Sequence, residues 1–450
     1  MTKVAVLDIG KTNLKVALVD LATLSEIAVE TAPNRVDVTG PWPHFDVSAQ
    51  REFLFNGLRK LAISHSIDAI SVATHGACAA LLDGAGDLAA PVMDYEFTGP
   101  DHLREDYDAI RPAFIETGSP ALPLGLNLGA QLHFMLATDA SLRDRLAHVV
   151  TWPQYWGYLL TGNLACDLSS LGCHTDLWDP HISRWSTLVS KLGLSSAMAQ
   201  PRKSTDLLGN LTPDCQRELG LGAVPVYVGI HDSNASLLPH LRSHPQPFSV
   251  VSTGTWVISM AIGGRAEDLD PRRDTLINVD AFGAPVPSAR FMGGREYSLI
   301  SDGRTFACSS EDEAAVLSKL LMMMPSVVAD CGPFPALKYE WTSQPASDGE
   351  LGVALGYYLG LMTAQCLRNI GADGPTVVEG PFAQNRQFLE MLATATGREV
   401  QTSSARTGTA IGAAMLRFCP VEQTGHRLRV SSSPRLLDYA RLWQERVNDR

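Results

Sequence analysis

A short segment near the amino terminus carries the groups that an oligophosphate requires. Asp8 and Gly10 end an apolar run, and three residues with hydrogen-bond donors follow at once: Lys11, Thr12 and Asn13. A glycine lets a ligand approach the backbone closely, and hydroxyl, amide and ammonium groups donate to phosphate oxygens. A carboxylate beside such a turn suits Mg²⁺. The segment predicts a phosphate-binding turn with Asp8 as a metal ligand, and a purely structural polar β-turn is the alternative.

Two segments in the second half of the chain offer related groups. Thr253, Gly254 and Thr255 form a polar turn between two apolar runs, as in the first segment. Paired with the first turn, they predict a second set of phosphate donors. Gly380 to Asn385 lies between a short apolar run and a helical pattern, where a flat base such as adenine can pack. Taken singly, each segment is also explained as a structural turn, with Asn385 as a helix N-cap.

One further segment could act on a hydroxyl group. His231 and Asp232 follow an apolar run, at the place where open α/β sheets hold their ligands. Asp232 can accept a hydroxyl proton there as a general base. Asp232 is also a good helix N-cap, and the two roles are compatible.

The elements that must position these residues alternate between strands and helices. Apolar runs of strand length lie at residues 4–10, 14–20, 67–74, 225–229, 248–260 (a hairpin), 376–378 and 398–401. Helical patterns lie at residues 311–324, 351–370, 386–396 and 408–418, while 101–148 and 186–222 are helical or irregular. This alternation predicts an α/β protein whose sheets are mostly covered by helices.

The hairpins at the start of each half of the chain share one pattern. Each has an apolar strand, a turn in which a glycine stands beside Thr, Ser or Asn, and a second apolar strand. The repetition indicates an internal duplication, with the proline-containing loop 240–247 as the junction. We therefore predict an N-terminal domain at residues 1–240 and a C-terminal domain at residues 241–450, since 450 residues suffice for two or three domains.

The composition limits the classes of partner. The chain is 45% hydrophobic, and its 36 Lys and Arg against 48 Asp and Glu give a net charge of −12, unlike a nucleic-acid-binding protein. No apolar stretch approaches the length of a membrane span, and the amino terminus lacks a signal-peptide pattern. Eight scattered cysteines without a C-x-x-C pair indicate reduced thiols. We expect a cytoplasmic protein that binds neither nucleic acid nor membrane.

Four of the segments, in this order along the chain, resemble the motifs of the FGGY family of carbohydrate kinases. The family motifs are D-x-G-x-T/S, G-x-H/C-D, S-G/T-G-T/S and G-G-x-x-x-N. Here they stand at residues 8–13 (DIGKTN), 229–232 (GIHD), 252–255 (STGT) and 380–385 (GPFAQN). The likeness covers nearly the whole chain. It implies an α/β fold of the two-domain, actin-like (ribonuclease H-like, duplicated) ATPase type with an interdomain cleft.

The resemblance also implies a role for each segment. Asp232 would be the catalytic base, and Asp8 would hold the Mg²⁺ of MgATP. The C-terminal domain and the first hairpin would bind ATP through Gly10, Lys11, Thr12, Asn13, Thr253, Gly254, Thr255, Gly380 and Asn385. A sugar would lie between the domains, with the N-terminal domain supplying His75, Gly76, His231, Asp232 and Ser233. Closure of the domains would then exclude water.

Two departures and one likeness bear on the ligands. Pro381 and Phe382 stand where family members usually carry a second glycine and a small residue, which alters the expected adenosine contacts. Residues 74–83 and 168–179 look more like rhamnulose and fuculose kinases than like xylulose or glycerol kinases. Those kinases carry an aromatic residue where this chain has His75. We interpret His75 as the partner of a sugar hydroxyl, with a structural histidine as the alternative.

These resemblances predict an ATP-dependent kinase that phosphorylates the terminal primary hydroxyl (O1) of a ketose, most closely a 6-deoxy-ketohexulose such as L-rhamnulose or L-fuculose. A kinase for a pentulose, tetrulose or polyol is the nearest alternative. The alternative of another class is an actin-like nucleotide-binding regulator without sugar turnover. Asp232 after His231 favours a kinase, because a non-catalytic clamp does not need it. Family members are often homodimers, so a second copy is the protein partner that the resemblance suggests.

Overall fold

The structure is a computed structural model, and it describes residues 2–402, 408–417, 429–430 and 433–450. Cys419 and the last residue of the helix predicted over 408–418 lie outside these ranges. The chain forms two compact units. Unit 1 comprises Met1–Ser243, Ile277–Pro285 and Arg406–Glu422, and unit 2 comprises His244–Leu276, Val286–Ala405 and Gln423–Arg450. The chain therefore returns to unit 1 twice after residue 243.

The central sheet of unit 1 has the strand order β13-β14-β6-β1-β2-β3, with β15 also paired to β6. Its strands are β1 (Lys3–Ile9), β2 (Asn13–Asp20), β3 (Ser25–Pro33), β6 (Ala69–Thr74), β13 (Leu207–Asn210), β14 (Pro225–Tyr227) and β15 (Ile230–His231). β1 and β2 form the antiparallel hairpin, and β6 runs parallel to β1 with Ile9 opposite Thr74. The first turn and the residues that follow Thr74 therefore emerge at the same edge of this sheet.

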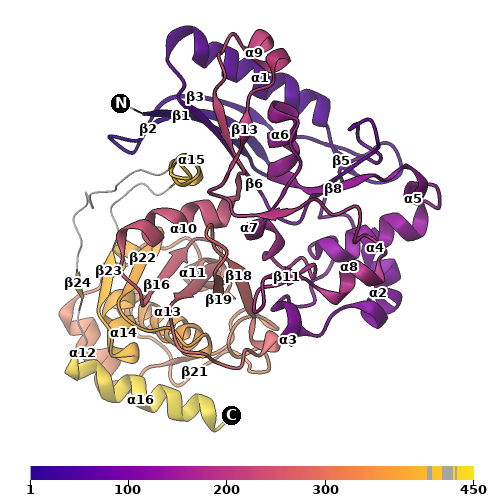
Figure 1. Cartoon of the computed structure of the whole chain (residues 1–450). Coiled ribbons are helices and arrows are strands. Elements are labelled where there is room, and N and C mark those ends of the chain that lie inside the picture. The colour runs from indigo at the N-terminus through magenta and orange to yellow at the C-terminus, as the bar shows by residue number, and fades with distance from the viewer. Residues whose placement is uncertain (1, 403–407, 418–428, 431–432) are drawn as a thin grey trace. The chain divides into compact units, whose positions relative to one another are not determined.

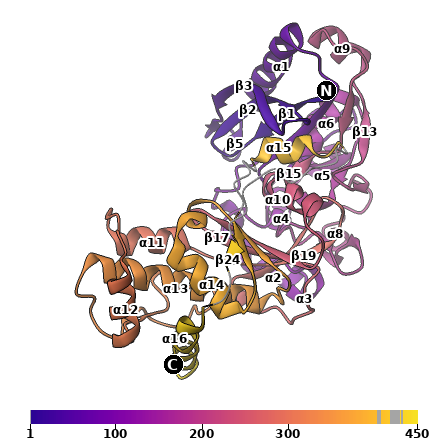
Figure 2. The ribbon, with the colours of Figure 1, turned by 90° about the vertical axis from the view of Figure 1, so that its left-hand side faces the viewer.

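Alternation of buried side chains along β1 explains why helices cover both faces of this sheet. Ala5 and Leu7 join the core that contains Leu54 and Leu58 of α1 (Val47–Ser64). Val4 and Val6, which point the other way, join the core that contains α15 (Thr409–Ala414). Figures 1 and 2 show α1 and α15 on opposite sides of the β1–β2 hairpin. The sheet edge that carries the polar residues is thus set on a rigid, two-sided core.

The rest of unit 1 consists of shorter elements. Its small strands are β4 (Val36–Asp37), β5 (His44–Phe45), β7 (Ala79–Leu82), β8 (His148–Thr151), β9 (Cys166–Asp167), β10 (Trp178–Asp179), β11 (Arg184–Trp185) and β12 (Pro201–Arg202). Its other helices are η1 (Gly99–Leu103), α2 (Arg104–Ile110), α3 (Phe114–Thr117), α4 (Leu128–Thr138), α5 (Leu142–Arg145), α6 (Trp152–Thr161), α7 (Leu168–Leu171), α8 (Thr187–Lys191), α9 (Pro213–Leu219) and α10 (Asp232–Ser243).

The second sheet has the strand order β18-β19-β17-β16-β22-β23-β24. Its strands are β16 (Phe248–Thr253), β17 (Val257–Ile262), β18 (Thr275–Val279), β19 (Pro285–Phe291), β22 (Thr376–Glu379), β23 (Val400–Thr402) and β24 (Arg429–Val430). β16 and β17 are antiparallel, and β22 runs parallel to β16. The series β3-β2-β1-β6-β14 and β19-β17-β16-β22-β23 therefore repeat one arrangement, which confirms the predicted duplication.

Helices of unit 2 pack on this sheet and on one another. They are η2 (Pro271–Arg273), α11 (Gly293–Ser301), α12 (Ser310–Lys319), α13 (Asp348–Asn369), η3 (Pro381–Gln384), α14 (Arg386–Thr396) and α16 (Pro434–Asn448), beside the small strands β20 (Met323–Met324) and β21 (Glu340–Trp341). α13 is buried along most of its length, with Ser347 capping its amino end. α13 and α14 lie side by side in both views (Figures 1 and 2).

Some predicted elements differ from the structure. The helix predicted over 311–324 ends at Lys319, because Leu320 adopts a left-handed conformation with φ of 49° and the chain then forms β20. The segment 186–222, predicted as helical or irregular, contains β13, a strand of the central sheet. His231 was expected beyond a strand, but it is the last residue of the short β15.

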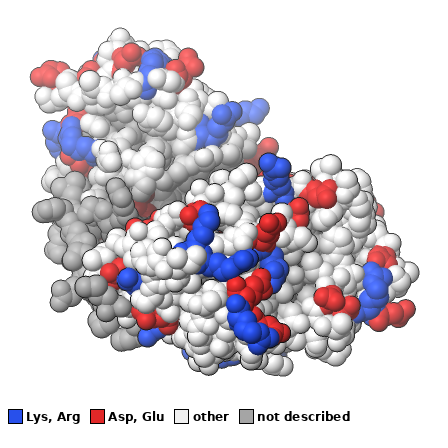
Figure 3. Space-filling view, turned by 90° about the horizontal axis from the view of Figure 1, so that it is seen from above, with Lys and Arg blue, Asp and Glu red and all other residues white. Residues whose placement is uncertain are grey.

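Charges are mixed on the surface that Figure 3 shows, where Lys and Arg are interspersed with Asp and Glu over a largely uncharged surface. Within the described ranges, none of the helices combines the length and apolar character needed to cross a membrane.

All seven cysteines that the structure describes are free thiols, as the spacing predicted.

Candidate active site

The first predicted phosphate turn is a closed hairpin turn between β1 and β2. The backbone N–H of Gly10 donates to the carbonyl of Asn13 at 2.9 Å, and the side chain of Asn34 donates to the carbonyl of Gly10 at 2.8 Å. Thr12 and Asn13 are exposed, and the amide of Asn13 donates to the hydroxyl of Thr12 at 3.1 Å. The turn is therefore held by its own backbone, and its polar side chains face outward.

Lys11 does not share this orientation. Its ammonium group forms an ion pair with Asp94 and lies 3.3 Å from the carboxylate of Glu96. It also lies over the rings of Phe45 and Tyr95, 5.3 and 5.0 Å from their centroids. Lys11 thus contacts residues far along the sequence, whereas the side chains of Thr12 and Asn13 are exposed at the turn.

Asp8, at the end of β1, has an environment that suits a divalent cation. Burial raises the pKa of Asp8 to about 6 against the lowering effect of Lys15, and the nearby carboxylate of Asp232 adds to the rise. A cation would relieve this repulsion. Within the described ranges no three His, Cys, Asp or Glu side chains converge on one point. The residues therefore fit Mg²⁺, which commonly takes one or two carboxylates and completes its shell with water and phosphate oxygens.

Asp232 stands where β15 passes into α10. One of its carboxylate oxygens accepts from the backbone N–H of Ser233 at 2.6 Å and lies 3.2 Å from Nε2 of His231. The side chain of Asp232 is still 33% exposed, and Ser233 is exposed. The N-cap role expected for Asp232 differs from the structure, because Asp232 is the first residue of α10 and accepts from the N–H of the next residue; its carboxylate is accessible.

His231 is buried among groups that favour its charged form. Its Nε2 lies 3.7 Å from the sulfur of Cys173, and the amide of Asn234 lies 3.3 Å from its Nδ1. Burial lowers the pKa of His231, but Cys173 and Asp232 outweigh it and raise the value to about 9. A charged His231 would donate a charge-assisted hydrogen bond to the carboxylate of Asp232 and so fix its orientation.

A buried network that sequence reasoning missed fixes the backbone of His231. Asp167 is fully buried and accepts hydrogen bonds from the hydroxyl groups of Ser169, Ser170 and Ser204. The hydroxyl of Ser169 in turn accepts from the backbone N–H of His231 at 3.0 Å. The only sequence signal was the Asp-Leu-Ser-Ser pattern, which is typical of a helix N-cap.

His75 and Gly76 lie directly after β6. His75 is 5% exposed, its Nδ1 lies 2.9 Å from the carbonyl of Gly76, and burial lowers its pKa. Its Nε2 is buried and has no hydrogen-bond partner within the residues that the structure describes. A Cβ atom on Gly76 would lie 2.8 Å from Nε2 of His231, so only glycine fits between the two histidines. The orphaned nitrogen suits a hydroxyl group from a ligand.

In unit 2, Thr253 joins the second turn to the Gly380 segment. Its hydroxyl donates to the carbonyl of Glu379 at 2.6 Å and accepts from the N–H of Phe382 at 3.1 Å. Gly380 has a φ of +83°, and a Cβ there would lie 2.0 Å from the carbonyl oxygen of Thr253. Thr253 is buried, while Gly254 and Thr255 are exposed. Thr253 therefore holds the two segments together, while Gly254 and Thr255 remain exposed.

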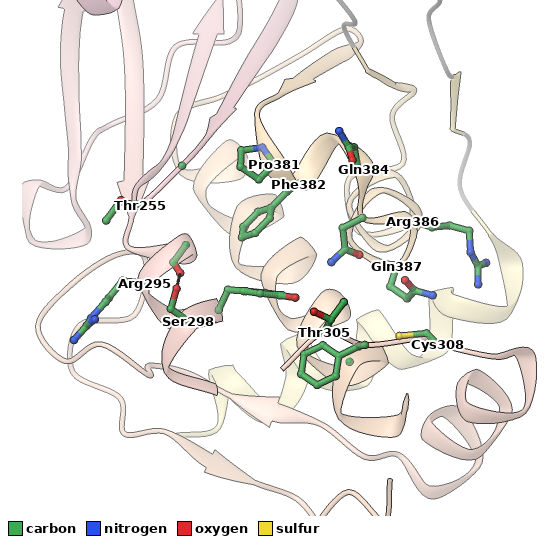
Figure 4. Close-up of a pocket in the computed structure, with 16 residues that line it drawn as sticks. Thr255, Arg295, Ser298, Thr305, Cys308, Pro381, Phe382, Gln384, Arg386 and Gln387 are labelled. Carbon is green, nitrogen blue, oxygen red and sulfur yellow. Dashed lines mark hydrogen bonds between the residues drawn. The ribbon is translucent and has the colours of Figure 1, made fainter. Parts of the chain in front are cut away.

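These segments border one pocket of about 950 Å³ within unit 2. Its lining consists of Gly254, Thr255, Gly294, Arg295, Tyr297, Ser298, Thr305, Phe306, Cys308, Gly352, Pro381, Phe382, Gln384, Asn385, Arg386 and Gln387. Figure 4 shows Phe382 near the middle, Thr255 and Arg295 on one side, and Gln384, Arg386 and Gln387 on the other. The pocket thus brings together the Gly254–Thr255 turn and the 380–385 segment, which lie far apart in the sequence.

The departure at positions 381 and 382 gives this pocket an aromatic wall. Phe382 is 7% exposed, and its ring centroid lies 5.9 Å from that of Tyr297 and 5.4 Å from that of Phe388. The side chain of Asn385 accepts from the N–H of Phe388 at 3.0 Å, which confirms its N-cap role. A base would therefore meet a rigid aromatic surface here instead of a glycine backbone.

Arg295 is a residue of this pocket that sequence reasoning missed. It is exposed at the start of α11, and its backbone N–H donates to the carbonyl of Thr255 at 3.3 Å. Its guanidinium has no ion pair within the described ranges. Gly294 permits this approach, because a Cβ there would lie 2.0 Å from the carbonyl oxygen of Gly254. The Gly-Gly-Arg sequence was the one available signal, and it fits no motif by itself.

The predicted site residues thus form two groups, one in each unit. Unit 1 holds Asp8, Gly10, Lys11, Thr12, Asn13, His75, Gly76, His231, Asp232 and Ser233, and unit 2 holds Thr253, Gly254, Thr255, Gly380 and Asn385. Within each group the contacts above connect distant parts of the sequence.

Comparison with known proteins decides the family. Residues 245–426 match the family described as "Carbohydrate kinase FGGY, C-terminal domain". The crystal structure of a carbohydrate kinase from Novosphingobium aromaticivorans is 33% identical, with a TM-score of 0.92 over 100% of this chain and 99% of that one. The chain belongs to the FGGY family of carbohydrate kinases. The FGGY resemblance, the duplicated actin-like fold and the phosphotransferase class predicted from the sequence are confirmed at the level of this family.

Two curated sugar kinases are similar to this chain at lower sequence identity. An L-fuculokinase from Salmonella typhi is 26% identical over 282 residues, which are 59% of this chain and 57% of that protein. A rhamnulokinase from Pectobacterium atrosepticum is 26% identical over 223 residues, which are 47% of this chain and 42% of that protein. The matched region thus spans about half the length of these curated relatives.

Proposed function

We propose that this FGGY kinase transfers the γ-phosphoryl group of MgATP to the terminal primary hydroxyl group, O1, of a ketose. The pocket of unit 2 carries the proposal, because it places the Gly254–Thr255 turn and the 380–385 segment around one volume of nucleotide size. The exposed carboxylate of Asp232 supports the same reaction from unit 1.

Asp232 is the proposed catalytic base. It takes the proton of O1 while O1 forms a bond to the γ-phosphorus atom. The bond from that phosphorus to the oxygen bridging the β-phosphate breaks, and ADP leaves with the electron pair. His231 orients the carboxylate through its 3.2 Å contact, and Asp167 and Ser169 hold His231 in place.

Asp8 would hold Mg²⁺, which neutralises charge on the phosphate oxygens when it is bound. The exposed side chains of Thr12 and Asn13 and the exposed turn at Gly254 and Thr255 offer donors to the phosphates. Such donors stabilise charge that moves during phosphoryl transfer.

The pocket of unit 2 is proposed to bind the adenosine part of ATP. Phe382 and Tyr297 present aromatic surfaces on which a purine can stack. Gln387 lies deeper, where its amide donates to the carboxylate of Glu313 at 3.1 Å and so has a fixed orientation. Arg295 lies on the side of Thr255, where the phosphates of the nucleotide would lie.

For the acceptor, we propose a 6-deoxy-ketohexulose such as L-rhamnulose or L-fuculose. The curated fuculokinase and rhamnulokinase matches support this choice, as do residues 74–83 of the sequence. The buried, unpartnered Nε2 of His75 would accept or donate one hydrogen bond to a sugar hydroxyl. A pentulose, tetrulose or polyol remains the alternative acceptor. A small-molecule sugar is thus the expected partner, while a cytoplasmic location and a homodimer stay predictions.

The experiment that tests the proposal measures ADP release with MgATP across ketoses, aldoses, polyols and sugar-free buffer. A rate that rises with one ketose and not in buffer supports the kinase and names its substrate. Sugar-independent hydrolysis, or nucleotide binding without turnover of any panel member, would favour the regulator of the actin-like fold instead.

A further inference from the structure

Lys11 is held on the unit 1 side of the first turn by two carboxylates and two aromatic rings. Its side chain is 17% exposed, and Asp94, its ion-pair partner, has a side chain that is 9% exposed. Glu96 lies 3.3 Å away on the outside, and the rings of Phe45 and Tyr95 face the ammonium group. The two carboxylates compensate the positive charge of Lys11, so Lys11 attracts a phosphate less than an unpaired lysine would.

The same rings surround His75. Its ring lies 5.0 Å from that of Phe45 and 5.4 Å from that of Tyr95, measured between centroids. Both Lys11 and Asp232 are close enough to His75 to act on its pKa. The orphaned Nε2 of His75, which is more than nine-tenths buried, therefore belongs to one cluster with Lys11 and with the proposed base.

The hydrogen-bonding capacity of this cluster is not filled within the protein. An ammonium group has three donors, of which one bonds to Asp94, and each carboxylate can accept more bonds than it receives here. Nε2 of His75 adds a further unfilled position. A polyhydroxylated ligand, whose hydroxyl groups both donate and accept, would fill these positions, and its C–H groups would contact the aromatic rings.

The charges of the cluster select among such ligands. One cation faces two carboxylates, Asp94 and Glu96, so the charge of Lys11 is more than compensated. Burial lowers the pKa of His75, which keeps that ring neutral. A carboxylate on the ligand would therefore meet two carboxylates of like charge at this cluster, which disfavours its binding.

We propose that Lys11, held by Asp94 and Glu96, binds hydroxyl groups of the acceptor, and that the two carboxylates restrict the acceptor to neutral sugars and exclude sugar acids. The inference rests on the proposed kinase activity. It assigns Lys11 to acceptor specificity in place of the nucleotide contact that the motif resemblance implied.

The first test compares Lys11→Met with Lys60→Met, a matched lysine of α1 whose ammonium pairs with Glu30 at the surface. The loss of charge-assisted hydrogen bonds in Lys11→Met should raise KM for the ketose by about tenfold or more, with KM for ATP within about twofold of wild type. Lys60→Met should change neither. A raised KM for ATP with an unchanged KM for the ketose would overturn the assignment.

Folding and activity are controlled separately. Because Lys11→Met leaves Asp94 without its cation, the double variant Lys11→Met/Asp94→Asn removes both charges and preserves the fold if the single variant loses it. Equilibrium binding of ketose and of ADP to each variant, measured by calorimetry, needs no turnover. Weakened ketose binding with unchanged ADP binding supports the proposal, and the reverse contradicts it.

The second test concerns the exclusion of sugar acids. Wild type should phosphorylate its ketose much faster than D-gluconate, whereas Glu96→Gln, at an exposed position, should raise kcat/KM for gluconate relative to that for the ketose by about tenfold. Efficient gluconate turnover by wild type would overturn the proposal while leaving kinase activity intact. Absence of turnover with every neutral sugar would instead contradict the proposed function, so the two failures are distinguishable.

Discussion

Asp232 owes its proposed role to two contacts that act on one carboxylate oxygen. The N–H of Ser233 and Nε2 of His231 hold the same oxygen, at 2.6 and 3.2 Å. The side chain remains 33% exposed and can therefore reach a ligand. A general base must combine a fixed orientation with access to the proton that it removes, and this position provides both.

At the residue scale, Asp232→Asn should lower kcat by orders of magnitude, because an amide cannot take the proton of O1. The amide oxygen can still accept from the N–H of Ser233, so the fold should be retained. Steady-state rates and circular dichroism check the two parts of this prediction. Turnover near that of wild type would remove Asp232 from the role of base.

Arg295→Gln should raise KM for ATP by about tenfold or more, since a guanidinium–phosphate hydrogen bond is charge-assisted. KM for the sugar should hardly change, because Arg295 belongs to the unit 2 pocket. Arg272→Gln is the matched control, as Arg272 is exposed in unit 2 and pairs with Asp270. If both variants raise KM for ATP equally, the cause is the general loss of positive charge and not a contact between Arg295 and a phosphate.

At the scale of elements, α11 connects the pocket of unit 2 to its core. Glu296 is 1% exposed and accepts hydrogen bonds from the N–H of Val328 and the hydroxyl of Tyr358, a residue of α13, both at 3.0 Å. The next residue, Tyr297, lines the pocket. A buried carboxyl group thus fixes the helix that presents Tyr297 to the pocket, and its ionisation should change the free energy of unfolding.

Burial raises the pKa of Glu296 to about 7 from the ordinary 4.5, against the lowering effect of its hydrogen bonds. The folded protein therefore binds a proton more tightly than the unfolded chain. The resulting stabilisation is complete below about pH 4.5 and is lost as the pH rises through 7, by about 3 kcal/mol in total. Glu296→Gln should lack this part of the pH dependence in urea unfolding.

The control for this measurement is Glu52→Gln, an exposed glutamate of α1. It should unfold with the pH dependence of wild type. If the difference in free energy of unfolding between wild type and Glu296→Gln stays constant from pH 4.5 to 8, the pKa of Glu296 is not raised.

At the scale of the whole molecule, the two units have separate cores, and each carries one group of site residues. A ligand that binds one unit stabilises that unit first, because binding to the native form reduces its local opening. The net charge of −12 and the mixed charges of Figure 3 give nucleic acid no basic surface on the face shown. The effect of each ligand on the stability of its unit can be measured on the intact chain.

Hydrogen exchange should therefore separate the two ligands. ADP alone is expected to slow exchange in residues 293–301 and 381–396, which border the unit 2 pocket. The ketose alone should slow exchange in residues 73–78 and 229–236, around His75 and Asp232. Protection of the unit 2 pocket by the ketose would contradict the assignment of the two sites.

The sequence by itself determined the elements whose signals are local. Runs of buried apolar residues located both hairpins, and the predicted bounds of the helix at residues 386–396 coincide with those of α14. The motif order and the repeated hairpin pattern identified the family and the duplication. Such features depend on neighbours within a few residues, so periodicity and turn chemistry suffice to read them.

The tertiary structure alone decided where the side chains of those motifs point. Lys11 meets Asp94, 83 residues away, and Arg295 reaches the turn at Thr255 through a glycine that fits against Gly254. Likewise, Ile277–Pro285 and Arg406–Glu422 belong to unit 1 although they follow the second hairpin in sequence. These contacts are set by packing between distant segments, which leaves no periodic trace in either segment. A motif can therefore name a turn, but the surrounding fold determines which ligand each of its side chains can reach.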